Sequence, residues 1–129
     1  MILPTVAPRF EPTILKWLRT AFPDTVFVTR LNAKKGDHVL IILDYLDKNT
    51  EVSQVVNVRI TVYGNNTQPT IDLDKAYKLM ADIQRFLLSQ YATTPAVSAT
   101  MLTGTSRIVD SSVNRECLYS VMQFAITAQ

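Results

Sequence analysis

Apolar residues recur at helical spacing along residues 73–91, which form the longest amphipathic stretch of the chain. Thr70 and Asp72 precede it and are candidate N-caps, because their side chains can accept hydrogen bonds from the first free N–H groups of a helix. The pattern predicts a long helix whose apolar face lies on a sheet. The side chains of that face are Leu73, Ala76, Tyr77, Met80, Ile83, Leu87 and Tyr91.

A shorter amphipathic helix is predicted over residues 11–22. Pro12 falls in its first turn, where a missing N–H costs least. Trp17 lies at the margin of the apolar stripe, and we expect it to pack in the core. Residues 1–10 contain two prolines and are expected to form an extended arm. The stripe itself consists of Ile14, Leu15, Leu18 and Phe22.

Five further segments are rich in β-branched and aromatic residues, which favours strands. Residues 38–46 contain an unbroken apolar run, typical of a strand covered on both faces. Ser and Thr are frequent in 97–109, which also contains Gly104, so we expect an irregular or bulged strand there. The predicted strands are 25–30, 38–46, 55–63, 97–109 and 116–128, and in the third Val56, Val58, Ile60 and Val62 alternate toward the core.

The order of these elements is α-β-β-β-α-β-β, read as a helix, a three-stranded meander, a helix and a hairpin. It predicts an α+β fold with a largely antiparallel sheet of four to five strands and both helices on one face. A chain of 129 residues suits one domain, here residues 11–129 after the arm. Because both sides of 38–46 and of the last strand look apolar, we expect another subunit to cover the second face.

The net charge and the residue types present limit the classes of function that this sequence suggests. The formal net charge is +2, and Lys34-Lys35 is the one adjacent basic pair, whereas nucleic-acid sites are basic stripes. Cys117 and His38 are the single residues of their types, so no disulfide framework or zinc site is expected. No apolar run reaches membrane-span length, and the N-terminus lacks the features of a secretory signal.

No catalytic constellation accompanies His38. There is no Gly-x-Ser-x-Gly elbow, and three isolated glycines exclude a Walker-type loop. Cys117 reads as a half-buried structural thiol. We therefore expect no enzyme activity, no catalytic residues, no metal and no cofactor.

Taken in order, several segments resemble the tail terminator (tail completion) proteins of long-tailed bacteriophages. The resemblance covers nearly the full length and lies in pattern and order. It consists of a Leu-Pro opening, the Trp17-Leu18 helix, the apolar strand 39–43, the alternating strand 56–62, the helix 74–88, the segment 106–110 and a last strand that begins with Arg115 and Tyr119.

The resemblance implies a homohexameric ring on the last ring of the tail tube, which stops tube growth and offers a surface to the head–tail connector. Its partners would be its own copies, the tail tube protein and the connector protein. Its place would be the tail–neck junction of the virion, after assembly in the host cytoplasm. Other neck or head-completion proteins of the same virions have similar sizes and compositions and remain an alternative.

Two sets of residues are candidate contacts in such a ring. Asp47, Lys48 and Glu51 belong to the polar loop 47–54, whose tip can project toward an axial partner. Near the second hairpin turn, Arg107, Asp110 and Arg115 could form pairs between neighbouring subunits.

A different functional hypothesis is that the protein is a nucleic-acid-binding module. It would use Arg59 and Tyr63 on one strand face. We expect no sequence-specific nucleic acid binding and no membrane association.

Overall fold

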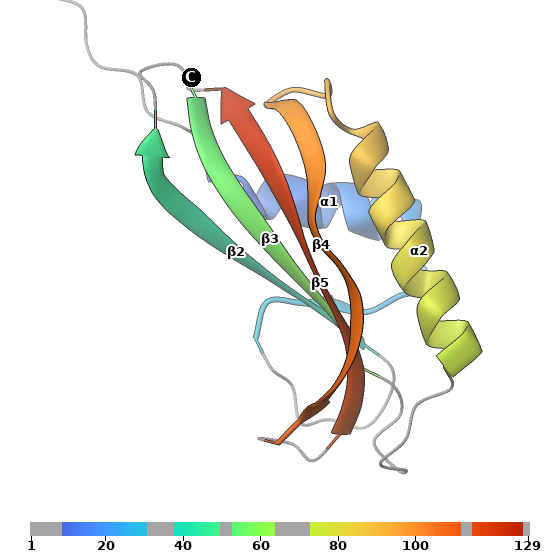
Figure 1. Ribbon diagram of the computed structural model, residues 1–129. Helices are drawn as coiled ribbons and strands as arrows, with labels where there is room; N and C mark the ends of the chain where they lie inside the picture. The colour runs from blue at the N-terminus through green and yellow to red at the C-terminus, as the bar shows by residue number, and fades with distance from the viewer. Residues whose placement is uncertain (1–8, 31–37, 50–52, 64–72, 112–114, 128–129) are drawn as a thin grey trace, which may run out of the picture.

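The computed structural model describes residues 9–30, 38–49, 53–63, 73–111 and 115–127. They form two helices and a five-stranded sheet in the predicted order, so the predicted α+β class is confirmed (Figure 1). The helices are α1 (Glu11–Ala21) and α2 (Leu73–Ser89). The strands are β1 (Phe27–Val28), β2 (His38–Asn49), β3 (Ser53–Tyr63), β4 (Ala96–Asp110) and β5 (Arg115–Thr127).

The sheet has the strand order β1-β2-β3-β5-β4, which places β5, the last strand in sequence, between β3 and β4. Every neighbouring pair is antiparallel except β1 and β2, which run parallel. The predicted meander is therefore wrong in its first strand, which is not the hairpin partner of β2. β1 is also shorter than predicted. The Arg19 side chain donates a hydrogen bond to the Phe27 carbonyl oxygen (3.1 Å), which in a wider sheet would accept one from a further strand.

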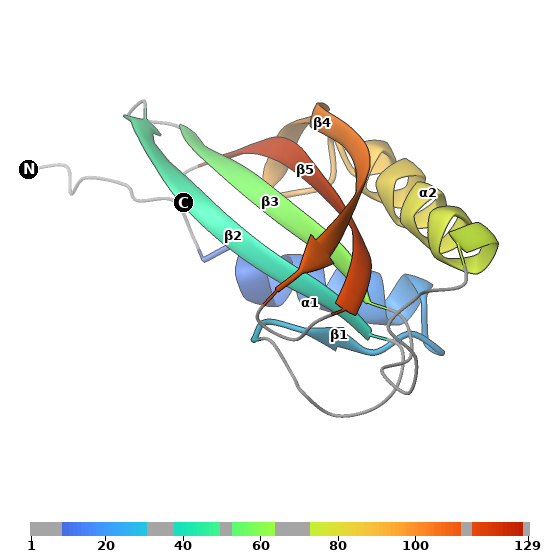
Figure 2. The same ribbon diagram turned by 60° about the horizontal axis from the view of Figure 1, so that its bottom comes forward.

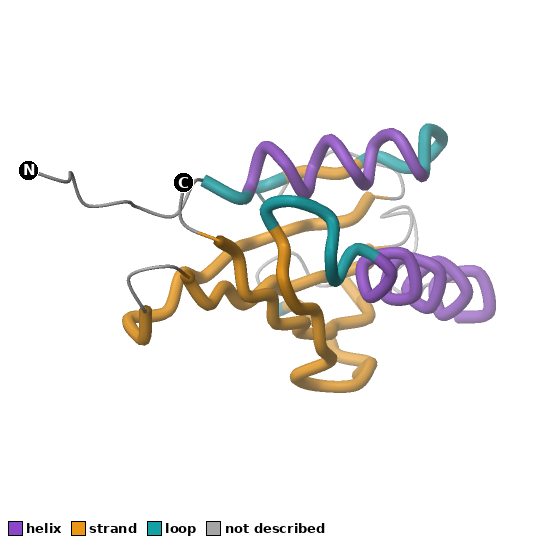
Figure 3. Tube along the Cα trace, turned by 90° about the horizontal axis from the view of Figure 1, so that it is seen from above, coloured by secondary structure: helices purple, strands orange, loops and turns teal. Residues whose placement is uncertain are grey.

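Both helices lie on one face of the sheet, as predicted. α1 crosses behind the strands, and α2 runs beside β4 and β5 (Figures 1 and 3). In Figure 2, β1 lies below α1 and beside one end of β2. We call the sheet face that carries the helices the helix face, and the opposite one the open face.

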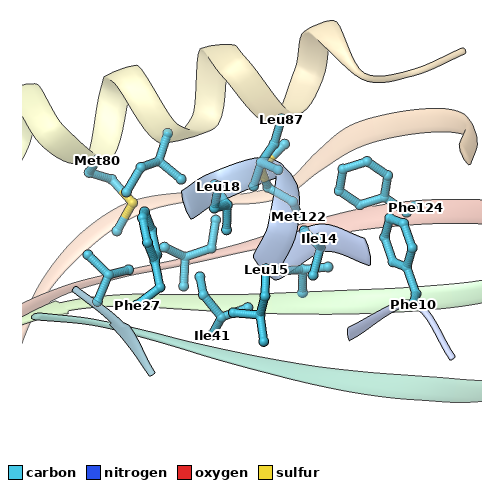
Figure 4. Packing of buried hydrophobic residues seen from close by; sticks show 14 of the residues in the cluster. Phe10, Ile14, Leu15, Leu18, Phe27, Ile41, Met80, Leu87, Met122 and Phe124 are labelled. Atoms are coloured by element: carbon cyan, nitrogen blue, oxygen red, sulfur yellow. The ribbon is translucent and has the colours of Figure 1, made fainter. Parts of the chain in front are cut away.

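The hydrophobic core fills the space between the helices and the helix face (Figure 4). The alternation predicted for β3 is confirmed, because Val56, Val58 and Ile60 are fully buried against α1 and α2. Phe10 joins the start of α1 to the sheet: its ring centroid lies 5.5 Å from that of Trp17 and 5.2 Å from that of Phe124. The core role expected for Trp17 is therefore confirmed.

Several boundaries differ from the prediction. β2 and β3 extend into the predicted loop 47–54, of which residues 50–52 lie outside the described part of the chain. α2 ends at Ser89, two residues early, where the Ser89 hydroxyl donates to the Phe86 carbonyl oxygen. The candidate caps Thr70 and Asp72 and most of the predicted arm lie outside the described residues.

Candidate interaction surface

One end of the open face carries a small apolar cluster of Leu40, Tyr63 and Cys117, all of them buried. The His38 ring stacks on the Tyr63 ring with their centroids 4.9 Å apart, and the Tyr63 hydroxyl donates a hydrogen bond to Asp110 (2.7 Å). Cys117 is thus more deeply buried than the half-buried thiol predicted from the sequence. This apolar end is already buried within one subunit and does not by itself require a second one.

Two polar pairs lie farther along the open face. Arg59 Nε lies 2.8 Å from a carboxylate oxygen of Asp44, and the Gln123 amide donates to the Asn57 side-chain oxygen (3.0 Å). These pairs explain why the outward side of β3 is polar although it lies in the middle of the sheet. The open face is therefore mixed rather than continuously apolar.

Exposed apolar side chains gather instead at one lateral edge of the sheet. Of the large apolar residues that are exposed in the described part of the chain, most lie on β4, on α2 or directly after α2. We call the exposed apolar side chains of β4 the β4 edge: Val97, Met101, Leu102, Ile108 and Val109. Tyr77 and Tyr91 extend this surface onto α2 and the turn that follows it, while Val26 and Tyr45 lie at the opposite edge.

β4 is an edge strand with three interruptions in its pairing with β5, which confirms the predicted irregularity. The shifts fall between Ala96 and Ser98, between Met101 and Thr103, and between Thr103 and Ser106. A bulge leaves an extra residue without a partner on the neighbouring strand. Val97 and Leu102 hold the extra positions of the first two shifts, and each is 51% exposed.

Side-chain hydrogen bonds hold the bulged part of β4 in place. The buried Ser120 hydroxyl donates to the Thr103 carbonyl oxygen (3.0 Å) and accepts a hydrogen bond from the Gln84 amide of α2 (3.0 Å). Gln84 also donates to the Thr105 hydroxyl (2.9 Å), and Thr103 Oγ1 accepts from the backbone N–H of Val121 (3.0 Å). Backbone groups that a regular ladder would satisfy are satisfied here by side chains.

Replacing Ser120 with alanine is expected to lower the free energy of unfolding by about 1–3 kcal/mol, because buried groups lose their partner. Equilibrium urea unfolding followed by circular dichroism measures the change. Ser98→Ala is the matched control, since Ser98 is exposed on the neighbouring strand β4, and it should change the free energy by no more than about 0.5 kcal/mol. Equal effects of the two substitutions would contradict this role of Ser120.

Two of the three predicted subunit contacts near the second hairpin, Arg107 and Asp110, have side-chain partners within the chain. Arg107 Nη2 donates to both carboxylate oxygens of Glu116 (2.7 and 2.8 Å), and these bonds raise the pKa of the Arg107 guanidinium. Asp110 accepts the Tyr63 hydrogen bond and lies opposite Arg115 in the strand register. The structure thus places these residues together at one end of the sheet, and their contact with a neighbouring subunit stays a prediction.

In the other predicted contact set, Asp47 and Lys48 lie at the opposite end of the sheet. Asp47 and Lys48 are in the last part of β2 rather than in a loop, because β2 continues to Asn49. Their side chains, and Glu51 altogether, lie outside what the structure describes. Their contact with an axial partner stays a prediction.

Sequence reasoning missed the β4 edge. Residues 97–109 were predicted only as an irregular or bulged strand, and no exposed apolar surface was assigned to them. The one available signal was the high Ser and Thr content of residues 97–109, which is unusual for a strand that is buried on one face.

The described residues show few features of a metal site, a membrane-spanning protein or a nucleic-acid-binding module. No group of three or more His, Cys, Asp or Glu side chains there is placed to hold a metal ion. Neither of the two helices is long and apolar enough to cross a membrane. Arg59 and Tyr63, on which the nucleic-acid reading depends, both have protein partners, which reduces the charge and hydrogen bonding that they can offer to a phosphate.

Comparison with known proteins adds no relative: no protein-family model matches the chain, and no curated protein matches it.

Proposed function

We propose that this protein is a structural virion protein that forms a ring, expected to be a homohexamer, at the head-proximal end of a bacteriophage tail tube. There it ends tail polymerisation and provides the surface to which the head–tail connector binds. It works by binding and uses no catalytic chemistry.

The observation that carries the proposal is the position of the exposed apolar surface. It lies along β4 and the flank of α2, at one lateral edge of the sheet, and two separate exposed apolar residues, Val26 and Tyr45, lie at the opposite edge. Two different surfaces on opposite sides of a subunit suit head-to-tail contacts, and such contacts close into rings when the rotation between subunits permits. The fold, with its order α-β-β-β-α-β-β, is the one that the hydrophobic pattern of the sequence predicts.

The test is the absolute mass of the purified protein by light scattering over a range of concentrations, with and without tail tubes assembled from the tube protein of the same virus. We expect either a closed oligomer or a monomer that assembles once tubes are added. Electron microscopy should then show the protein as a cap on one end of each tube, and tube growth should stop there.

The outcomes separate the candidates. A protein that ignores tube ends but binds the isolated connector would replace the terminator with another neck or head-completion protein. Steeply salt-dependent DNA binding would favour a nucleic-acid-binding module. A monomer that is indifferent to tubes, connector and DNA would contradict the proposal.

A further inference from the structure

The two lateral edges of the sheet both present strand backbone that no strand of the described chain pairs with. β4 has β5 on one side only, and β1 pairs with β2 only at Val39 and Leu40. The stretch of β2 from Ile41 to Tyr45 therefore has no neighbouring strand on this side within the described residues. Unpaired N–H and C=O groups along an edge form a template for another strand, so each edge can accept an extended backbone.

We propose that the β4 edge of one subunit binds the open edge of β2 in a second copy of this chain, with the two strands antiparallel, so that the sheet continues from subunit to subunit. The inference rests on the proposed function, because it names the surface through which the ring subunits meet.

Strand direction favours a second copy as the occupant. Three successive antiparallel pairings connect β2 to β4 through β3 and β5, so β4 runs opposite to β2. A copy placed beside β4 in the same orientation therefore presents its β2 antiparallel to β4. Rotation about an axis roughly along the strands keeps this orientation from one subunit to the next, as a ring requires.

The strand register also places matching parts of β4 and β2 at the same height across the sheet. The register places Thr100 level with Gln123, Asn57 and Asp44, so the regular part of β4 around Thr100 lies at the height where β2 is open. Ala99 is level with Tyr45 by the same pairings, and a same-orientation copy would set the exposed Tyr45 ring beside Met101. Diagonal neighbours on paired strands lie within reach of aromatic side chains.

The same correspondence holds at the other end of the edges. Ile108 is level with Cys117, Tyr63 and His38, and the parallel pairing of β1 continues this level to Val26. Ile108 and Val26 are both exposed apolar residues. Of the exposed apolar residues of the β1–β2 edge, Val26 thus lies level with Ile108, and Tyr45 lies diagonal to Met101.

The composition and size of the β4 edge fit a protein partner. Between Ala96 and Ser106 the strand carries no charged residue, so nothing on it selects an ionic partner. Its five exposed side chains offer on the order of 400 Å² of apolar surface, the size at which a patch marks an interaction site. Main-chain pairing and contacts of the α2 flank would bring the buried area toward the roughly 800 Å² per partner that is typical of a stable interface.

The test compares two variants that each add two lysines. Val97→Lys/Leu102→Lys places them on the β4 edge at exposed bulge positions, so no charge is buried in the monomer. Thr20→Lys/Ala21→Lys adds the same charge at exposed positions of α1. Light scattering gives the mass of each, with and without tail tubes, and circular dichroism confirms that both are folded.

We expect the wild type and the α1 variant to assemble alike, and the β4 variant to remain monomeric at concentrations at least about tenfold higher, because lysine on an edge strand opposes pairing. Hydrogen exchange of the wild type should slow on assembly at the outward amides of β4 near Thr100 and of β2 near Asp44, by about tenfold or more.

The outcomes distinguish this inference from the function itself. Assembly of the β4 variant at wild-type concentrations, or unchanged exchange in β4 and β2, would overturn the strand pairing and leave the terminator function standing. An oligomer that depends on β4 but ignores tube ends would overturn the function and support the pairing. A wild type that is monomeric under every condition would overturn both.

Discussion

Replacing Phe124 with alanine is expected to lower the free energy of unfolding by about 3–5 kcal/mol, the cost of removing a large side chain from a well-filled core. Phe124 is fully buried on β5 and contacts the Phe10 ring, which fastens the start of α1 to the sheet. A domain of this size has a total stability of about 5–15 kcal/mol. The variant would therefore lose a large fraction of its stability.

Urea unfolding followed by the fluorescence of Trp17, the single tryptophan, measures this change. Trp17 also contacts Phe10, so its emission reports directly on this part of the core. Phe124→Leu is the control and should cost less than about 1.5 kcal/mol if repacking conserves most of the volume. A cost for Phe124→Leu as large as that for alanine would show that the site requires the aromatic ring itself rather than its volume.

An aspartate at Ile83 is expected to prevent stable folding. Ile83 is fully buried at the centre of the α2 face that lies on the sheet. A carboxylate there would be desolvated, and the resulting loss should exceed about 4 kcal/mol, in the range that only buried charges and comparable defects reach.

The matched control is Tyr77→Asp on the same helix. Tyr77 is exposed and lies near Arg107, so an acid at this position remains solvated. Circular dichroism and thermal melting should show a cooperative transition for the control and none for Ile83→Asp. A cooperative, near-native melt of Ile83→Asp would mean that α2 does not depend on this face for docking.

Periodicity in the sequence was sufficient to predict the fold class, the order of elements and the buried faces of the main ones. Met80, Ile83 and Leu87 were assigned to the core from helical spacing, and the alternation of β3 identified its buried side. These features are local: each depends on the spacing of side chains within one element, which sequence displays directly.

The arrangement of strands could not be predicted in the same way. Nothing local in residues 25–30 shows that β1 would run parallel to β2, or that β5 would insert between β3 and β4. Strand pairing brings together segments that are far apart in the sequence, so it depends on the fold of the whole chain and not on any one segment.

The candidate surface was missed for a related reason. Whether Val97 or Leu102 points outward depends on the register of β4 against β5, and each bulge changes that register by a residue. Arg107 finds its partner Glu116 across the same pairing. The sequence contains both residues of such a pair, but only the register of the two strands shows that they are neighbours.

The central position of β5 has a consequence for synthesis of the chain. β5 supplies Leu118, Met122 and Phe124 to the core and holds β4 to β3, yet it is translated after the other four strands of this sheet. Until residues 115–127 have emerged from the ribosome, the nascent chain cannot complete its sheet, and β3 has an open apolar edge. Because N-terminal segments emerge first, at about 5–20 residues per second, this interval is when the chain is most exposed to misassembly and to chaperones.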